Sequence, residues 1–262
     1  MKIIISDKNK KDLFIALFQS LKNCSSVVSI QFDVDKLHIQ GMDKSHVCLF
    51  DVNIQKTWFD GYDIQEKSTL CIDTNIFHLI ISTKSDGLNI VIHNDSKDED
   101  NLHVDLLAVE NANSSFKGDF NKYFKIPLVD FEYEEMNISL VDYDAEFSIS
   151  AKKICDIVSQ MLTFGTNINV KCSEETIDLV TNGIAGEMLV NIPIQDLTEY
   201  SIVEGGEINL AYSLNYINKM CLTNKLTNEI DFSIGIDCPM KISYNLGDGS
   251  SIVFFIAPKI QD

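Results

Sequence analysis

Arginine is absent from this sequence. All 21 basic residues are lysine, and 39 acidic residues give a formal net charge of −18. The commonest specific contact between a protein and a DNA base is made by arginine to guanine, so a reader of base sequence is not expected. An acidic chain also repels polyanions over most of its surface. Any binding of a polyanion is therefore expected only at a local basic patch.

Long apolar runs and paired cysteines are also missing. No run approaches the roughly 20 residues of a membrane-spanning helix. The start, Met1–Lys8, has neither the apolar stretch nor the cleavage site of a signal peptide. The cysteines are odd in number and never form C-x-x-C, which excludes the usual zinc and thioredoxin signatures. We expect reduced, buried thiols, no membrane partner, and a cytosolic or nuclear location.

Sequence signatures of enzymes do not occur. There is no phosphate-binding G-x-x-x-x-G-K-[ST] loop, and no G-x-G-x-x-G, H-E-x-x-H or G-x-S-x-G. The acidic stretch Asn94–Asp100 lacks the ligand spacing of a calcium loop and is interpreted as a solvated turn. No catalytic residue, no metal site and no cofactor is predicted. One enzymatic alternative is a metal-dependent hydrolase that uses connector carboxylates such as Glu134 and Glu135.

An internal repeat organises what is present. A constant offset of 140 residues places the apolar pattern of the first half on that of the second, largely without gaps. For example, Phe14 falls on Ile154, and Ile30 falls on Val170. The match lies in apolar character and not in identity. This is the pattern expected of two copies of one fold that kept only their cores.

The periods within each copy predict the fold class. Apolar positions at helical spacing predict helices over Asp12–Lys22 and Asn75–Thr83. Alternating positions predict strands, including a hairpin that pairs Asn89–His93 with Leu102–Leu106. Each half is thus expected to be an α+β domain with two helices packed on antiparallel sheet. The predicted domains are residues 1–128 and 144–262, joined by a connector over residues 129–143.

The connector combines carboxylates with apolar residues that linkers normally lack: Met136, Ile138, Leu140 and Tyr143. They either pin the connector to the sheet beneath or form the wall of a groove for a partner. The residues alone leave both interpretations open.

Several bases fall on the outer faces of the predicted helices. On a helical wheel, Lys8, Lys11 and Lys22 lie near each other and away from the apolar face. Lys152, Lys219 and His78 take outward positions on the other helices. Ordinary surface lysine explains each one singly. Together they predict a weakly basic, helix-lined surface suited to a polyanion held through its phosphates.

Four segments carry a family resemblance. Leu37–Leu49 and Phe254–Ile260 resemble the most recognisable segment and the ending of the proliferating cell nuclear antigen family, the eukaryotic and archaeal DNA sliding clamps. Lys125–Asp130 resembles the entry to its interdomain connector, and Asp237–Met240 resembles a late strand with a proline. The resemblance covers essentially the whole chain.

The resemblance implies a closed, six-domain trimeric ring around duplex DNA, bound without regard to base sequence. It implies a processivity factor for a DNA polymerase that is opened by a clamp loader ATPase. It also implies a docking platform for replication and repair proteins, located in the nucleus or at a viral replication site. Partner peptides would carry a Gln-x-x-aliphatic-x-x-aromatic-aromatic motif. A monomeric processivity factor of the same fold is the alternative.

Site residues follow from the same resemblance by position. The DNA-facing residues would be Lys8, Lys11, Lys22, His78, Lys84, Lys152 and Lys219. The partner-peptide groove would be lined by Met42, His46, Val47, Leu49, Met136, Ile138, Tyr143, Pro239, Phe255, Ala257 and Pro258. The subunit interface would pair Asn121–Leu128 with Gly186–Pro193 and include Tyr123, Ile126, Leu189 and Asn191.

Departures from the family pattern concern charge. The stretch Tyr62–Lys67 holds a single base where the family has several. His78 and Phe18 stand at positions where relatives carry bases, and Glu174 stands near a lysine that is modified in many relatives. The hole of the ring is therefore predicted to be less positive than is usual in the family.

Overall fold

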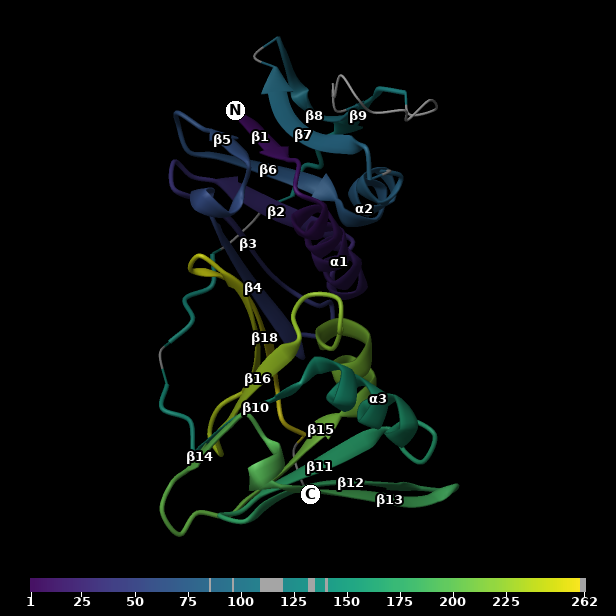
Figure 1. Cartoon of the computed structure of the whole chain (residues 1–262), viewed down its shortest axis with the longest axis vertical. Coiled ribbons are helices and arrows are strands. Elements are labelled where there is room, and N and C mark those ends of the chain that lie inside the picture. The colour runs from purple at the N-terminus through teal and green to yellow at the C-terminus, as the bar shows by residue number, and fades with distance from the viewer. Residues whose placement is uncertain (85, 96, 109–119, 132–134, 140, 260–262) are drawn as a thin grey trace. The chain divides into compact units, whose positions relative to one another are not determined.

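The computed structural model describes residues 1–84, 86–95, 97–108, 120–131, 135–139 and 141–259. The chain forms two compact units (Figure 1). Unit 1 comprises Met1–Gly41, Asp51–Met136 and Gly247–Ser250, and unit 2 comprises Met42–Phe50, Asn137–Leu246 and Ser251–Asp262. The predicted domain boundaries placed Met42–Phe50 in the first domain, whereas its contacts group it with unit 2.

Unit 1 is built from two sheets and two helices. One sheet has the strand order β5-β1-β7-β8-β9, and β4-β3-β2-β6 follow one another in a second. The strands are β1 (Lys2–Ile5), β2 (Val27–Phe32), β3 (Lys36–Met42), β4 (Cys48–Gln55), β5 (Gly61–Asp63), β6 (Ser68–Asp73), β7 (Leu88–Asp95), β8 (Asp98–Ala108) and β9 (Lys122–Pro127). The end of β3 and the start of β4, up to Phe50, are grouped with unit 2. The helices are α1 (Lys8–Cys24), α2 (Thr74–Ser82) and the short 3-10 turn η1 (Lys56–Trp58).

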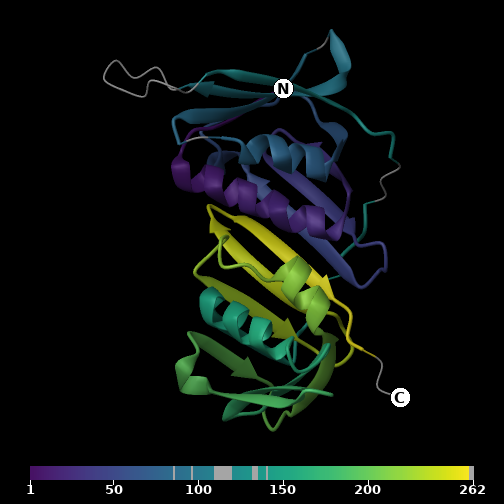
Figure 2. The same ribbon diagram turned by 90° about the vertical axis from the view of Figure 1, so that its right-hand side faces the viewer.

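Both helices begin at an aspartate cap and lie side by side (Figure 2). The carboxylate of Asp7 accepts a hydrogen bond from the backbone N–H of Lys10, and α1 therefore begins earlier than the predicted Asp12. Asp73 caps α2 in the same way. Between them Phe18 and Phe77 bring their ring centroids to 4.4 Å, and both side chains are fully buried. This aromatic contact fixes the helix pair over the sheets and leaves one face of each helix exposed.

Unit 2 repeats the same strand order. Its sheets run β14-β10-β16-β17-β18 and β13-β12-β11-β15, which correspond strand for strand to the two series of unit 1. The strands are β10 (Ala145–Ser150), β11 (Asn167–Cys172), β12 (Thr176–Gly183), β13 (Gly186–Pro193), β14 (Glu199–Ile202), β15 (Ile208–Ser213), β16 (Glu229–Ile234), β17 (Met240–Gly247) and β18 (Ser250–Ile256). The helical segments are α3 (Ala151–Met161), η2 (Ile194–Asp196), α4 (Leu214–Tyr216) and a π-helical turn, η3 (Ile217–Cys221). The α+β class and the duplication are confirmed.

The predicted offset of 140 residues holds in one sheet of each unit and slips in the other. Ile30 pairs with Ile39, and Val170 pairs with Leu179, as the offset requires. However, Ile92 pairs with Val104, while Phe232 pairs with Ile242, so β8 and β17 correspond at an offset of 138. A shift of two residues keeps every side chain on its own face of the sheet. The alternation of apolar residues is therefore the same with or without this shift, and the sequence pattern does not reveal it.

Candidate peptide groove and helix face

A hollow of about 270 Å³ lies within unit 2, between the loop before β4, the second part of the connector and the end of β18. Its lining is mostly apolar, with Leu49, Ile138 and Phe255 on three sides. It is lined by Met42, His46, Val47, Leu49, Asn137, Ile138, Ser139, Val141, Tyr143, Cys238, Pro239, Phe255 and Ala257. Nine of the eleven predicted groove residues are therefore brought together.

Asp43 holds the loop that forms one wall of this groove. The side chain is buried, and its carboxylate accepts hydrogen bonds from the backbone N–H groups of Ser45, Val47 and Cys48 at 2.7–2.8 Å. These bonds hold a turn in which His46 has a φ of 58°, in the left-handed region that few residues other than glycine adopt. The loop is thus preorganised, because its backbone donors are satisfied without a ligand.

Two predicted groove residues, Met136 and Pro258, do not line the hollow. The backbone of Met136 is instead held by the amide of Gln40 in unit 1. Its N–H donates to Gln40 Oε1 at 2.7 Å, and its carbonyl accepts from Nε2 at 3.0 Å. Gln40 is therefore a positioning residue that the sequence did not reveal. It fixes the connector immediately before Asn137, where unit 2 resumes.

Four residues of the lining were not predicted: Asn137, Ser139, Val141 and Cys238. Cys238 and Ser139 adjoin predicted residues in the sequence, and that adjacency was the available signal. Tyr143 is half-buried in the groove, and burial raises the pKa of its hydroxyl to about 12. The hydroxyl therefore stays protonated at neutral pH and can donate a hydrogen bond to a ligand. Leu140, which the sequence suggested as a connector anchor, lies outside the described residues.

The predicted DNA-facing residues fall into two groups. Lys152 and Lys219 are exposed on α3 and η3, and Lys22 approaches Nδ1 of His78 at 3.2 Å between α1 and α2. At the start of α1 the charges are balanced. Lys8 pairs with Asp86 at 2.7 Å, and the largely buried Lys84 pairs with Asp12 at 2.7 Å.

The expected exposure of Lys11 is wrong. Its side chain is 1% exposed, and Nζ donates to the backbone carbonyls of Asp86 and Leu88 at 3.0 and 2.8 Å. Burial, reinforced by the nearby charge of Lys84, lowers the pKa of the Lys11 ammonium. The wheel placed this residue outward, but the segment that enters β7 covers it. Lys11 is therefore a structural residue and not a contact for a ligand.

The predicted interface residues lie on two edge strands. β9 ends the five-stranded sheet, and β13 ends the four-stranded sheet. Tyr123 and Leu189 are 69% and 58% exposed, and Asn191 is exposed while donating to Asp178. Ile126 is fully buried opposite Leu102, so its side chain is not available to a neighbour.

Metal and membrane signals are absent from the part of the chain that the structure describes. Within it, no three His, Cys, Asp or Glu side chains are arranged to hold a metal ion. Glu134, which the hydrolase alternative requires, is outside that part. No described helix combines the length and apolarity needed to cross a membrane.

Comparison with known proteins gives relatives of matching length. A Plasmodium falciparum protein named proliferating cell nuclear antigen 2 is 24% identical over 95% of this chain and 96% of its own length. The DNA polymerase sliding clamp of Methanobrevibacter smithii is 24% identical over 93% of each chain. The crystal structure of PCNA from Thermococcus kodakaraensis superposes with a TM-score of 0.85 at 20% identity, covering 98% of this chain and 99% of its own.

Models of the two domains of one family account for nearly all of the sequence. The model described as proliferating cell nuclear antigen, N-terminal domain, matches residues 7–135, and the C-terminal domain model matches residues 137–259. The junction falls at Met136, the residue whose backbone Gln40 holds. The chain therefore belongs to the proliferating cell nuclear antigen family of DNA sliding clamps.

Proposed function

We propose that this chain is a DNA sliding clamp that closes into a homotrimeric ring around duplex DNA. The ring acts as a processivity factor for a DNA polymerase and as a docking platform for replication and repair proteins. It works by binding and carries out no chemistry of its own. The observation that carries the proposal is the repeated strand order. In the repeat, the edge strands β9 and β13 take the positions of β18 and β4, and β18 lies beside the start of β4 within unit 2.

The edges of the sheets support closure. β5 and β14 are short, β6 receives a hydrogen bond from Val129, and β15 receives one from Lys259. β9 and β13 are longer, and no described strand lies beyond them. Their counterparts in the repeat are β18 and β4, and within unit 2 the start of β4 lies beside β18. Pairing β9 of one copy with β13 of the next therefore repeats a junction that the chain already makes and removes two exposed edges.

Side chains at the two edges are complementary. β9 presents Lys122, Tyr123 and Lys125, of which Lys125 already pairs with Asp98 at 2.6 Å, while β13 presents Glu187 and Leu189. Basic and aromatic groups thus oppose acidic and aliphatic ones. An interface between unlike edges is heterologous, and it closes into a ring when the rotation between copies allows it.

The groove supports docking by peptides. An apolar hollow with a preorganised wall suits an aliphatic and aromatic anchor, which is a common mode of peptide recognition. We assign it to partners with the Gln-x-x-aliphatic-x-x-aromatic-aromatic motif, including the polymerase and the clamp loader ATPase. The location that follows is the nucleus or a viral replication site.

DNA is held loosely on the exposed helix faces through Lys22, His78, Lys152 and Lys219. With the start of α1 charge-balanced and no arginine in the chain, these contacts are few and independent of base sequence. Threading through a closed ring then provides retention, and weak contacts allow sliding.

The test compares circular and linear DNA. Clamps loaded by the cognate clamp loader onto nicked circular DNA are isolated by gel filtration, and the DNA is then cut once with a restriction enzyme. We expect clamps to remain on the circle and to leave after cutting, and sedimentation to give three times the 29.5 kDa chain mass. A 29.5 kDa particle that stays bound after cutting would instead support the monomeric processivity factor.

A further inference from the structure

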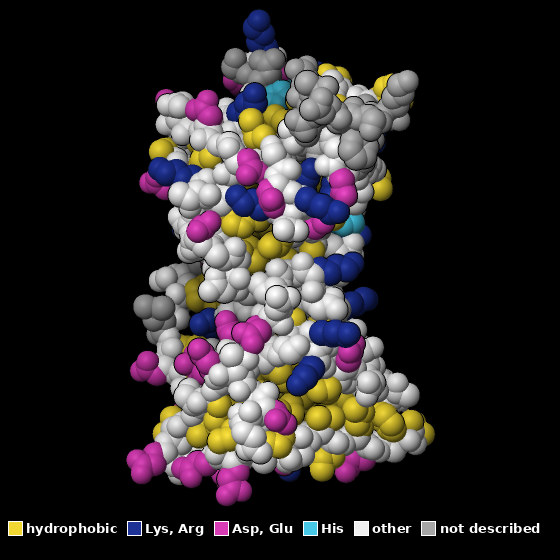
Figure 3. Space-filling model, viewed as in Figure 1, with side chains coloured by type: hydrophobic (Ala, Val, Ile, Leu, Met, Phe, Trp, Pro, Cys, Tyr) yellow, Lys and Arg dark blue, Asp and Glu magenta, His cyan; other side chains and the backbone are white. Residues whose placement is uncertain are grey.

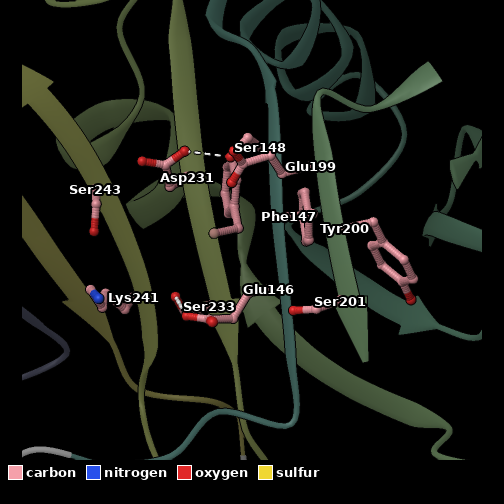
Figure 4. A pocket seen from close by; sticks show the side chains of 11 residues that line it. Glu146, Phe147, Ser148, Glu199, Tyr200, Ser201, Asp231, Ser233, Lys241 and Ser243 are labelled. Atoms are coloured by element: carbon pink, nitrogen blue, oxygen red, sulfur yellow. Dashed lines mark hydrogen bonds between the residues drawn. The ribbon is translucent and has the colours of Figure 1, made fainter. Parts of the chain in front are cut away.

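A second hollowed surface of unit 2 lies outside the groove. On the outer face of β14, β10, β16 and β17, two hollows of about 420 and 440 Å³ adjoin and share Ser148, Glu199 and Asp231 (Figure 4). We call the residues that line both hollows the acidic trough. In Figure 3 acidic side chains gather over this region of unit 2.

The strand register explains how the trough forms. Phe147 and Phe232 are cross-strand neighbours that point into the core, where their rings stack at 4.9 Å. The residues on either side of each phenylalanine must therefore point outward. This places two polar rows across the strands: Ser201, Glu146, Ser233 and Lys241 in one, and Glu199, Ser148, Asp231 and Ser243 in the other.

Hydrogen bonds hold the carboxylates in place within these rows. Ser233 Oγ donates to Glu146 Oε1 at 2.8 Å, and Ser148 Oγ donates to Asp231 Oδ1 at 2.5 Å. Both serines are buried, so the two acceptors are fixed by groups that themselves have little freedom. Because each carboxylate has further acceptor capacity, both can still bind a donor from a ligand.

Charge and an unsatisfied hydroxyl show which ligand the trough fits. The lining includes four carboxylates, Glu146, Glu199, Glu229 and Asp231, and a single ammonium, Lys241. In addition, Ser243 Oγ is buried and has no hydrogen-bond partner among the described residues. A buried hydroxyl without a partner carries a free-energy cost that a bound polar group would remove. A cationic ligand with hydrogen-bonding groups satisfies both features, whereas DNA would be repelled.

The trough adjoins the peptide groove. Lys241, which lines the trough, places Nζ 5.7 Å from the ring centroid of Tyr143, which lines the groove. We propose that the acidic trough binds an extended lysine- or arginine-rich segment of a partner protein, adjacent in sequence to the apolar motif that occupies the groove. The link to the motif rests on the proposed function, while the preference for a basic segment does not.

If both sites bind the same partner chain, their contributions to the affinity add. Once the motif occupies the groove, the basic segment meets the trough at a high effective concentration, so weak ion pairs add measurably to affinity. Such pairs are screened by salt, so the gain falls as ionic strength rises. The trough would thus distinguish partners that share the motif but differ in their flanking charge.

Fluorescence anisotropy with designed peptides tests the proposal. The probes are a motif peptide alone, the same motif with a Lys-Ser repeat at either end, the matched Glu-Ser versions, and the Lys-Ser repeat alone. With wild-type protein at about 50 mM salt, we expect a Lys-Ser repeat at one end to tighten binding about tenfold, and Glu-Ser to give no gain.

Two double variants separate local from general charge effects. Glu146→Lys with Glu199→Lys should abolish the gain and leave the affinity of the bare motif unchanged. Glu204→Lys with Glu207→Lys changes the charge equally at exposed residues outside the trough and should retain the gain. Glu146→Gln with Glu199→Gln repeats the test should the lysine variant fail to fold.

The outcomes distinguish the two proposals. Absence of a gain at either end, or equal loss of the gain in both charge-reversed variants, overturns the trough. Failure of the bare motif to bind overturns the groove assignment alone. In that case, binding of the Lys-Ser repeat that depends on Glu146 and Glu199 upholds the trough, and its absence overturns it.

Discussion

Single side chains decide whether the groove accepts a peptide. Ile138 is half-buried in the lining, opposite the wall that Asp43 holds. Replacing it by arginine places a charge in an apolar hollow, and burying that charge costs more than the contact supplies. We expect Ile138→Arg to weaken binding of a motif peptide at least about a hundredfold. Calorimetry measures this, and sedimentation should show an unchanged oligomer.

A matched control uses Val34, which is 46% exposed, belongs to unit 1 and does not line the groove. Val34→Arg makes the same kind of change and should leave the peptide affinity as it is. Equal loss of binding in the two variants, or none in Ile138→Arg, would contradict the groove assignment.

The buried Lys11 gives a prediction with a defined pH dependence. Lys11→Met leaves the carbonyls of Asp86 and Leu88 without their donor, so we expect the free energy of unfolding to fall by about 1–3 kcal/mol at pH 7. Burial lowers the pKa of Lys11 in the folded chain, so between that pKa and the unfolded value of 10.5 the unfolded state binds more protons. Wild-type stability should therefore rise relative to Lys11→Met as pH increases through this window.

Urea unfolding at pH 7 and at higher pH measures both effects. Lys8→Met, an exposed lysine on the same helix, is the control and should change stability little. A gap between wild type and Lys11→Met that is independent of pH would show that the ammonium is not held in its charged, desolvated form.

At the scale of elements, strand edges are the feature with the clearest test. Leu189 is exposed on β13, and the proposed mate strand β9 carries Lys122 and Lys125. Leu189→Arg removes an aliphatic contact and adds a like charge, so we expect the assembly to dissociate to the 29.5 kDa chain at micromolar concentration. Sedimentation velocity measures the mass, and circular dichroism should be unchanged.

Val203→Arg provides the comparison, since Val203 is 55% exposed next to the short edge strand β14. It should leave the assembly intact. If Leu189→Arg also sedimented like the wild type, β13 would not be the edge that joins copies.

Comparing the predicted with the observed strands and helices shows what the sequence could predict. The α+β class, the duplication and the hairpin of Asn89–His93 with Leu102–Leu106 follow from apolar periods, because those periods reflect which face is buried. The slip of β17 could not be found, since a shift by two preserves those periods. The burial of Lys11 and the hydrogen bonds from Gln40 to the backbone of Met136 could not be predicted either, because they depend on segments distant in the sequence. The last helix was expected as a regular one, but only Leu214–Tyr216 is α-helical before the π turn.

For the molecule as a whole, the feature to test is the presence of exposed lysines on helical segments of an acidic chain. Lys152 and Lys219 are exposed on helical segments of a chain with net charge −18. Lys152→Glu with Lys219→Glu should shorten the retention of loaded clamps on circular DNA by about threefold or more and flatten its dependence on salt. The fold, followed by circular dichroism, should not change.

Lys56→Glu with Lys171→Glu is the matched variant, because each pair lowers the formal net charge from −18 to −22. Neither residue lies on α1, α2, α3 or η3. If both pairs shortened retention equally, overall repulsion from DNA would explain the effect, and the helix lysines would have no special part in it.

The assignment of Met42–Phe50 to unit 2 has a practical consequence for dissecting the protein. A cut within the connector does not yield two complete domains, because the fragment from Asn137 onward lacks the loop that Asp43 holds. Such a fragment would lack one side of its peptide site and expose the buried edge of β18. Co-expression of both pieces should restore binding, because it supplies Met42–Phe50 to the rest of unit 2.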